Sequence, residues 1–258
     1  MSVRPVINFG YALPMLLLLG LPILALLFGS TVEGVWAGVQ HPIFLPALFR
    51  SLMAATISLA VIVLFGTPLA WWFSQSNGRF SRLLLLLVEL PVLLPPAVMG
   101  IALLETFGRS GVLSFLGLQI PFTLTAVVLA QTVVAAPYYI QLATHSFRTL
   151  NPDQLLLARS LGYGPRQVFW HVIVPVTLPA LMSGMVLSWA RAMGEFGATL
   201  LFAGNLTGRT QTLPLAIFSV LETDVNAAIS LSLVLLSVSL SVLFLLRHFG
   251  GKGSNTYD

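Results

Sequence analysis

The chain has 258 residues, of which 57% are hydrophobic and 8% are charged, and its mean hydropathy is +0.95. A soluble domain carries about 25% charged residues, so 12 basic and 8 acidic side chains are too few to cover a water-exposed surface of this size. Disorder needs low hydrophobicity and high charge. The composition therefore excludes a soluble enzyme and a disordered chain, and it predicts an integral membrane protein.

The formal net charge of +4 does not indicate a nucleic-acid partner, because the sequence has no basic run and no RNA-binding signature. A basic membrane protein usually carries its Lys and Arg residues in cytoplasmic loops. The absence of cysteine excludes disulfides, thiolate metal sites and cysteine catalysis. We expect this chain to contact membrane lipid and no nucleic acid.

Six apolar segments are long enough to cross a bilayer, which takes about 20 residues of helix. They are residues 11–29, 47–73, 83–104, 122–144, 178–203 and 225–246. The first is longer than the core of a signal peptide and no small-x-small cleavage site follows it closely, so we expect an uncleaved anchor helix. The chain is predicted to be one all-α transmembrane domain, residues 1–258, with six spans.

The sixth segment is ambiguous, because its serines alternate with apolar residues as in a strand. About twenty residues without a charge favour a helix instead. In a helix, each serine can donate a hydrogen bond to the carbonyl one turn earlier. We therefore predict a helix over residues 225–246.

The third segment contains three prolines, Pro91, Pro95 and Pro96, which predict a kinked span. The kink can be a hinge or only a packing feature, and the residues favour neither. Glu89 precedes the prolines. It is either a charge with a function inside the membrane or a residue that faces the cytoplasmic interface.

The distribution of basic residues predicts the orientation. With the amino terminus inside, eight basic residues fall on the inner side: Arg4, Arg79, Arg82, Arg148, Arg159, Arg166, Arg247 and Lys252. Three fall outside: Arg50, Arg109 and Arg209. The positive-inside rule therefore places both termini in the cytoplasm.

The inner segment of residues 147–177 is too long for a plain turn and too apolar for a solvated linker. Asn151 is a predicted N-cap, with Pro152 at the first helical position. Gly162 and Pro165 predict a turn, and a second short helix is expected to follow until Pro175. Such a helical hairpin can dock into a groove of another protein or rest on lipid headgroups, and the residues alone leave both open.

The same segment resembles the cytoplasmic signature of the permease subunits of ABC importers, which is Glu-Ala-Ala, three residues, Gly, nine residues and Ile-x-Leu-Pro. Ala158, Gly162 and Pro175 match it, whereas Leu156 and Leu157 replace the Glu and the first Ala. The resemblance implies a coupling helix docked in a cleft of an ATP-hydrolysing subunit. The implied docking residues are Ala158, Arg159, Ser160, Leu161, Gly162, Tyr163, Gly164, Pro165 and Arg166.

Residues 191–205 and 208–222 are similar to the molybdate branch of these permeases, which is close to the tungstate and sulfate permeases. The resemblance extends over the whole chain. It implies a homodimer that moves molybdate or tungstate by alternating access through the cytoplasmic (inner) membrane of a prokaryote. It also implies two ATP-binding cassette ATPase subunits, which hold ATP and magnesium, and a periplasmic or lipid-anchored oxyanion-binding protein. A sulfate or thiosulfate permease is the alternative cargo assignment.

No catalytic or nucleotide-binding motif accompanies this resemblance. The only lysine, Lys252, lacks the spacing of a phosphate-binding loop, and the four histidines have no metal-ligand spacing. We therefore expect no cofactor or metal on this chain and no enzymatic activity of its own. An intramembrane enzyme or a non-transporting assembly subunit is an alternative, as is a secondary carrier, which would show inverted repeats.

Charged residues inside spans are costly in hydrocarbon, so Glu89, Arg191 and Glu195 are candidates for the translocation pathway that the resemblance implies. Arg191 and Glu195 are four residues apart, which predicts a shared helical face. They are either a buried structural pair or part of a pathway near the gate, with Gly197 and Thr199 allowing close approach between subunits. An Arg191 left partly free could attract a tetrahedral oxyanion, but the balancing Glu195 argues against a strong anion site.

Overall fold

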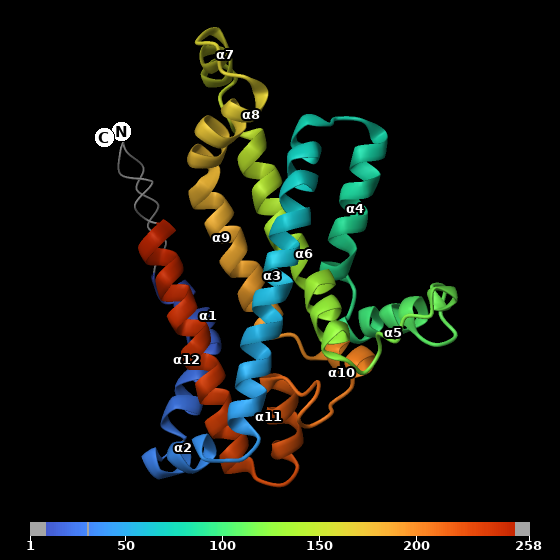
Figure 1. The fold of residues 1–258 in the computed structure, drawn as a ribbon. Coiled ribbons are helices and arrows are strands. Elements are labelled where there is room, and N and C mark those ends of the chain that lie inside the picture. Colours follow the sequence, from blue (N-terminus) through green and yellow to red (C-terminus); the bar gives the residue numbers. More distant parts are fainter. Residues whose placement is uncertain (1–8, 30, 251–258) are drawn as a thin grey trace.

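The computed structural model describes residues 9–29 and 31–250, and within these ranges it contains helices and no strand (Figure 1). The longer helices are α1 (Phe9–Phe28), α3 (Phe44–Gln75), α4 (Arg79–Leu93), α5 (Pro96–Phe107), α6 (Leu124–Arg148), α9 (Val174–Met193) and α12 (Val225–Gly250). The short ones are α2 (Val32–Val39), α7 (Pro152–Ser160), α8 (Pro165–Val168), α10 (Gly197–Ala203) and α11 (Leu213–Leu221), with the 3₁₀ turn η1 (Ser114–Leu116) and the π-helical turn η2 (Phe169–Ile173). The predicted all-α class is confirmed.

Five helices of the described chain are long and apolar enough to span a membrane, and the bent pair α4–α5 could make a sixth span. The third apolar segment was predicted to be a span kinked at its prolines, and the interruption in the structure is larger than a kink. The segment forms two helices, bent by 118°. Leu94 and Pro95 both have extended backbone, because a residue before a proline disfavours the helical region and neither Pro95 nor Pro96 has an N–H to continue the helix.

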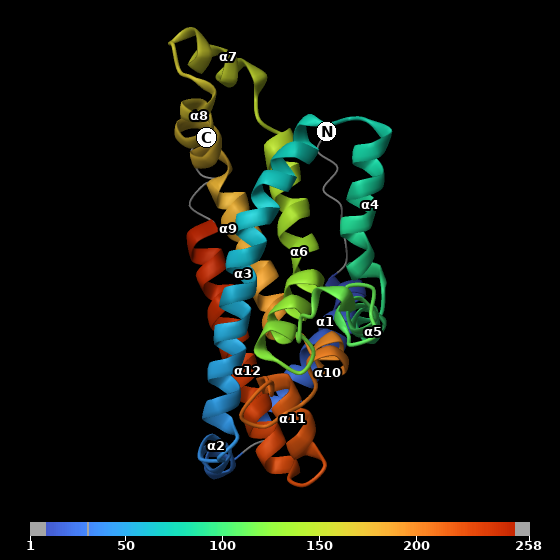
Figure 2. The same ribbon diagram turned by 45° about the vertical axis from the view of Figure 1, so that its right-hand side comes forward.

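Three helices, α3, α6 and α9, lie side by side and form the centre of the molecule (Figures 1 and 2). Small side chains let them approach closely, as is usual between membrane helices. The hydroxyl of Ser188 on α9 donates to the carbonyl of Ala135 on α6 at 2.8 Å, and the hydroxyl of Ser58 on α3 donates to Val128 of α6 at 3.1 Å. These buried bonds link the three helices without any buried charge.

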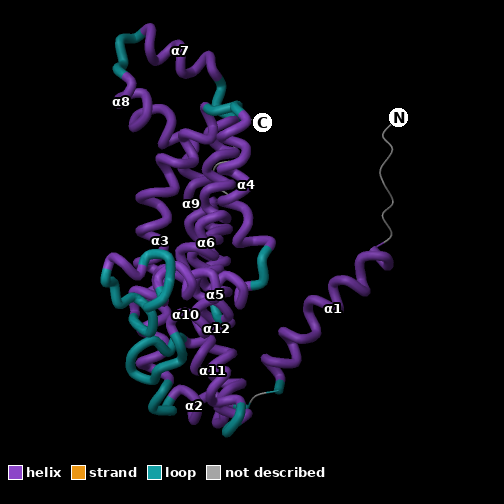
Figure 3. The backbone as a smooth tube through the Cα atoms, turned by 90° about the vertical axis from the view of Figure 1, so that its right-hand side faces the viewer, coloured by secondary structure: helices purple, strands orange, loops and turns teal. Residues whose placement is uncertain are grey.

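α1 lies apart from this centre and is inclined away from the other helices (Figure 3). None of its most apolar stretch, Tyr11–Phe28, is buried by the rest of the chain. The predicted first span is therefore helical, but its apolar surface is left open to lipid or to another protein.

α7 and α8 lie at one end of the molecule, whereas α2, α5, α10 and α11 lie toward the other (Figures 1 and 2). The helices α2 and α11 fall in connections for which the sequence analysis predicted no structure. Ser230 of α12 donates to the carbonyl of Gly34 in α2 at 2.7 Å, and Ser51 of α3 accepts from the N–H of Leu213 in α11 at 2.7 Å. These bonds attach both short helices to the long ones.

The serines of the sixth segment behave as predicted for a helix. Ser230, Ser232, Ser237, Ser239 and Ser241 each donate to the carbonyl four residues earlier, at 2.8–2.9 Å. Each hydroxyl thus has a partner within α12, and Ser230 shares its one hydrogen between Asn226 and Gly34 of α2. The strand-like alternation in the sequence therefore lies on a helix and not on a strand.

The fifth apolar segment also differs from its prediction. It was expected to be one helix over residues 178–203, but α9 ends at Met193 and the separate helix α10 begins at Gly197. At its other end, α9 continues without interruption into η2 and α8, so the expected stop at Pro175 is wrong. Pro175 lies inside this continuous helix, two residues after the π-helical turn η2, so its missing N–H does not end the helix.

Candidate functional site

The segment of residues 147–177, which we call the coupling segment, begins its first helix as the sequence predicts. The side chain of Asn151 accepts a hydrogen bond from the N–H of Asp153 at 2.9 Å, and Pro152 is the first residue of α7. The cap satisfies one of the N–H groups that have no partner at a helix start. The expected N-cap is therefore confirmed.

The turn between α7 and α8 depends on Gly162. Its φ is +86°, a left-handed conformation that is unfavourable for any residue with a Cβ. The N–H of Gly162 donates to Arg159 O at 3.0 Å, and the N–H of Tyr163 donates to Ala158 O at 3.2 Å. This pair of bonds is a Schellman motif, and it satisfies the last carbonyls of α7 while reversing the chain.

The second helix begins immediately after this turn. The N–H of Gly164 donates to the side chain of Gln167 at 2.9 Å, which caps α8. Gly164 itself has φ −70°, so its conformation is available to other residues. The two glycines of the turn therefore have different requirements although they are two residues apart.

The hairpin of α7 and α8 buries one side and exposes an apolar face on the other. Ala158 and Val168 are buried, with 6% and 4% of their surface exposed. Leu156, Leu157 and Leu161 are 60%, 63% and 71% exposed. Two of these leucines replace the Glu and Ala of the family signature, so the outward face is more apolar than that signature requires.

The remaining predicted docking residues surround this face. Arg159, Ser160, Tyr163, Pro165 and Arg166 are all exposed. The structure thus brings the predicted set together on one projecting hairpin (Figure 1). An exposed apolar strip flanked by two guanidinium groups is a suitable surface for a protein groove.

The base of the hairpin is held by an aromatic residue that the sequence analysis did not identify. The ring of Trp71 on α3 packs edge-on against Phe147 at 5.3 Å between centroids and against Phe169 at 5.8 Å. Such edge-to-face pairs stabilise a fold by more than the apolar surface they bury would do alone. Phe147 precedes the hairpin of α7 and α8 in the sequence and Phe169 follows it, so one side chain of α3 contacts both flanks of the hairpin.

A hydrogen bond strengthens the same junction. Arg148 at the end of α6 donates to the carbonyl of Phe73 on α3 at 3.0 Å. The bond satisfies a carbonyl near the carboxyl end of α3 and ties α6 to it. No sequence motif marks this junction, because its residues come from three separate segments.

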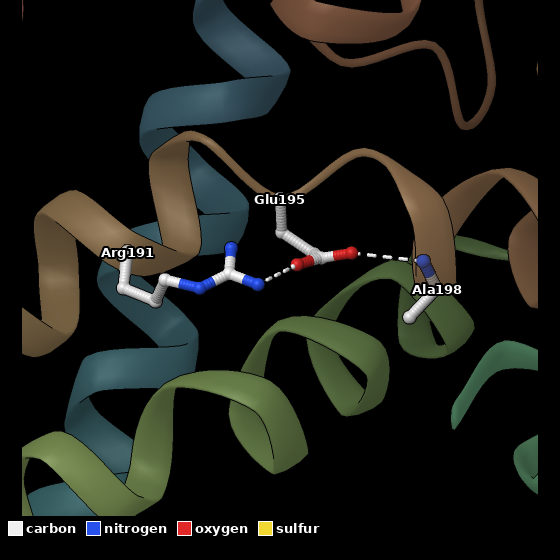
Figure 4. Close-up of polar contacts among 3 residues, drawn as sticks. All are labelled: Arg191, Glu195 and Ala198. Carbon is white, nitrogen blue, oxygen red and sulfur yellow. Dashed lines mark hydrogen bonds and ion pairs between the residues drawn. The ribbon is translucent and has the colours of Figure 1, made fainter. Parts of the chain in front are cut away.

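Arg191 and Glu195 form an ion pair across the break in the fifth segment (Figure 4). The Nη2 atom of Arg191 lies 2.7 Å from Oε2 of Glu195, and the other carboxylate oxygen accepts from the N–H of Ala198 at 2.8 Å. Glu195 is 1% exposed, and Arg191 is 26% exposed. The expected shared helical face is wrong, since Glu195 lies beyond the end of α9 and caps α10 instead.

Glycines allow α10 to pack closely against α5. A Cβ on Gly197 would lie 2.9 Å from the Cβ of Pro96, and one on Gly100 would lie 2.9 Å from the carbonyl oxygen of Ala198. The close approach at Gly197 is therefore made to α5 of the same chain. Thr199, beside it, is fully buried, and its hydroxyl has no hydrogen-bond partner within the described residues.

Glu89 is separate from this cluster. It lies on α4 and is partly exposed. Within the described residues no hydrogen bond or ion pair joins it to Arg191 or Glu195, so the structure does not bring all the predicted pathway residues together.

Residues from the stretch that carries the family resemblance form a polar network after α10. Gln211 donates to the side-chain oxygen of Asn205 at 3.0 Å, and Asn205 donates to the hydroxyl of Ser219 at 2.7 Å. Gln211 is 3% exposed. These residues therefore hold the connection between α10 and α11 in place rather than offering free groups to a ligand.

The sequence is similar to those of known transport proteins. The profile of a family described as "Binding-protein-dependent transport system inner membrane component" matches residues 62–252. The chain is 43% identical over 223 residues to the molybdenum transport system permease protein ModB of Mycobacterium tuberculosis, covering 85% of this chain and 84% of that protein. The molybdenum permease ModB of Escherichia coli is 31% identical over 205 residues, covering 78% and 90%.

Solved structures share the fold at low sequence identity. A chain of a bacterial ABC transporter involved in the import of the acidic polysaccharide alginate superposes with a TM-score of 0.72 at 15% identity, covering 96% of each chain. A chain of the MetNI methionine ABC transporter in inward-facing conformations gives a TM-score of 0.66, covering 81% of this chain and 95% of that one.

Proposed function

Since the chain belongs to the family of binding-protein-dependent transport system inner membrane components, we propose that it is the permease subunit of an ATP-driven ABC importer for molybdate. The observation that carries the cargo assignment is the 43% identity over 85% of the chain to a molybdenum permease. The proposed location is the cytoplasmic (inner) membrane of a prokaryote.

The proposed mechanism is alternating access by two copies of the chain, with the anion passing between them. Two ATPase subunits bind ATP and magnesium, and their closure is transmitted through the hairpin of α7 and α8. The exposed leucines of that hairpin support this role, because an apolar strip of this kind gains free energy when a protein groove covers it. A binding protein on the opposite side delivers the anion.

The proposed orientation places the hairpin end of the molecule in the cytoplasm. Arg79, Arg82, Arg148, Arg159 and Arg166 belong to the elements at or next to that end, whereas Arg50, Arg109 and Arg209 belong to the other. This asymmetry fits the positive-inside rule. Of the other three basic residues predicted on the inner side, Arg247 lies near the carboxyl end of α12, and Arg4 and Lys252 lie outside the described residues.

The ion pair of Arg191 and Glu195 is proposed to fix the joint between α9 and α10 at the gate. Its carboxylate neutralises the guanidinium and caps α10, so little positive charge remains to retain a passing anion. The packing of Gly197 on Pro96 then transmits movement of α10 to α5. Thr199 and Glu89 are the further candidates for residues along the pathway.

Uptake into vesicles tests the cargo. The permease is reconstituted with its ATPase and binding protein, and ATP-dependent uptake of labelled molybdate, tungstate and sulfate is compared in competition. We expect molybdate uptake that sulfate does not suppress. Uptake of sulfate with exclusion of molybdate would contradict the proposal, and vesicles without ATP give the background.

A further inference from the structure

A cavity of about 470 Å³ opens at the end of the molecule opposite the hairpin. It lies between the connection that follows α5 and the loop that follows α10, and it is lined by Glu105, Arg109, Gln119, Phe122 and Arg209 among others. This volume falls within the range of about 300–1,000 Å³ that is usual for small-molecule sites. The ion pair of Arg191 and Glu195 does not belong to it.

The arginines at this end of the molecule that have no hydrogen-bond or ion-pair partner in the described part of the chain line this cavity. Of the three arginines here, Arg50 donates to the carbonyls of Pro46 and Gly208. The guanidinium groups of Arg109 and Arg209 make no hydrogen bond or ion pair within the described part of the chain, and both line the cavity. Two arginines with unpaired guanidinium groups, from separate loops, thus line the same cavity.

One residue that lines the cavity, Phe122, has a strained backbone conformation. Phe122 has φ +62° although it is not a glycine, and its N–H donates to the carbonyl of Phe202 at 3.4 Å. Its ring covers Gly204, where a Cβ would lie 3.0 Å from the ring carbon Cδ1. Strain of this kind persists only where the surroundings enforce it, and it is concentrated at functional sites.

We propose that this cavity is a receiving site for a tetrahedral oxyanion dianion, bound by Arg109 and Arg209 before it enters the pathway. Guanidinium groups present forked donors that match the oxygens of such an anion. Glu105 lines the same cavity and repels the anion, which keeps the affinity low enough for release. The proposal rests on the proposed function, because it takes the cargo class from there.

Titration of the purified permease–ATPase complex with sodium molybdate, in the absence of binding protein, tests the site. We expect R109Q/R209Q to weaken binding by about tenfold or more, since two charge-assisted bonds are lost. E105Q is expected to tighten binding several-fold because it removes the repulsion. The matched control is E33Q, which neutralises an exposed carboxylate in a different cavity and should leave the affinity unchanged.

Three results would overturn the proposal. One is the absence of molybdate binding to the wild-type complex, and another is unchanged affinity in both R109Q/R209Q and E105Q. The third is unchanged molybdate binding in R109Q/R209Q together with weaker docking of the binding protein, which would make the cavity a protein-docking surface. Vesicle uptake by the wild-type complex is measured in parallel, so that uptake without binding at the cavity contradicts this inference alone.

Discussion

The guanidinium of Arg191 lies 2.7 Å from the buried carboxylate of Glu195, across the point where the fifth apolar segment breaks. The same carboxylate accepts from the N–H of Ala198. Glu195 therefore joins the end of α9 to the start of α10. It places the only ion pair within the described residues at the joint of two helices rather than on the face of one.

Replacing Glu195 with Gln should destabilise this joint. Gln keeps an oxygen for the N–H of Ala198 but leaves Arg191 without its counter-charge, at an expected cost of about 2 kcal/mol, which is below the value for a fully buried pair because Arg191 is 26% exposed. Thermal unfolding of the detergent-solubilised protein measures the loss. The double variant R191Q/E195Q should be more stable than the sum of the two single effects predicts. Simple additivity would contradict the account.

Gly197→Ala and Gly100→Ala should separate α5 from α10. Each added Cβ would lie 2.9 Å from an atom of the facing helix, and overpacking of this kind typically costs about 1–3 kcal/mol. We expect lower stability and lower molybdate uptake in both variants. Gly20→Ala is the control, because a Cβ at Gly20 meets nothing within 4 Å. Equal effects of all three changes would argue against a close α5–α10 contact.

Trp71→Ala should weaken the junction between α3 and the coupling segment. The change removes the ring contacts to both Phe147 and Phe169, and we expect ATP hydrolysis to continue with several-fold less molybdate transported per ATP. Trp71→Phe should restore part of the ratio. Trp72→Ala is the neighbouring control, since Trp72 is 40% exposed and its ring packs against Phe73 instead. An unchanged transport ratio in Trp71→Ala would show that the aromatic contacts do not transmit movement.

The apolar segments and the helix caps were predictable because they are local properties of the chain. Six apolar stretches with few charges predict helices in a bilayer, and Asn151 with Pro152 marks the start of α7. The bend of 118° between α4 and α5 was not predictable. Prolines show where a helix is interrupted, but the direction taken after Pro95 depends on what α5 packs against.

The candidate site was predictable in part for the same reason. Gly162 marks a turn by its own conformational freedom, and the turn forms as expected. The break before α10 depends on Glu195 capping a later N–H, and the role of Trp71 depends on two rings from distant segments. Such contacts arise only when the chain is folded, so spacing alone indicated a helical pair at residues 191 and 195 and gave no sign of Trp71.

The hairpin's role in coupling is the central claim, and two glycines of the same turn offer a matched comparison. Gly162 has φ +86° and Gly164 has φ −70°. A Cβ at Gly162 enforces strain of about 1–2 kcal/mol, which should reshape the turn that presents the leucines. A Cβ at Gly164 meets only the side-chain oxygen of Gln167 at 3.6 Å.

The most direct measurement is therefore ATP hydrolysis and molybdate uptake, recorded together in vesicles, for Gly162→Val and Gly164→Ala at equal membrane insertion. We predict that Gly162→Val inserts normally but loses both uptake and the stimulation of ATP hydrolysis by loaded binding protein, whereas Gly164→Ala retains them. Wild-type uptake and stimulation in Gly162→Val would contradict the coupling role of the hairpin.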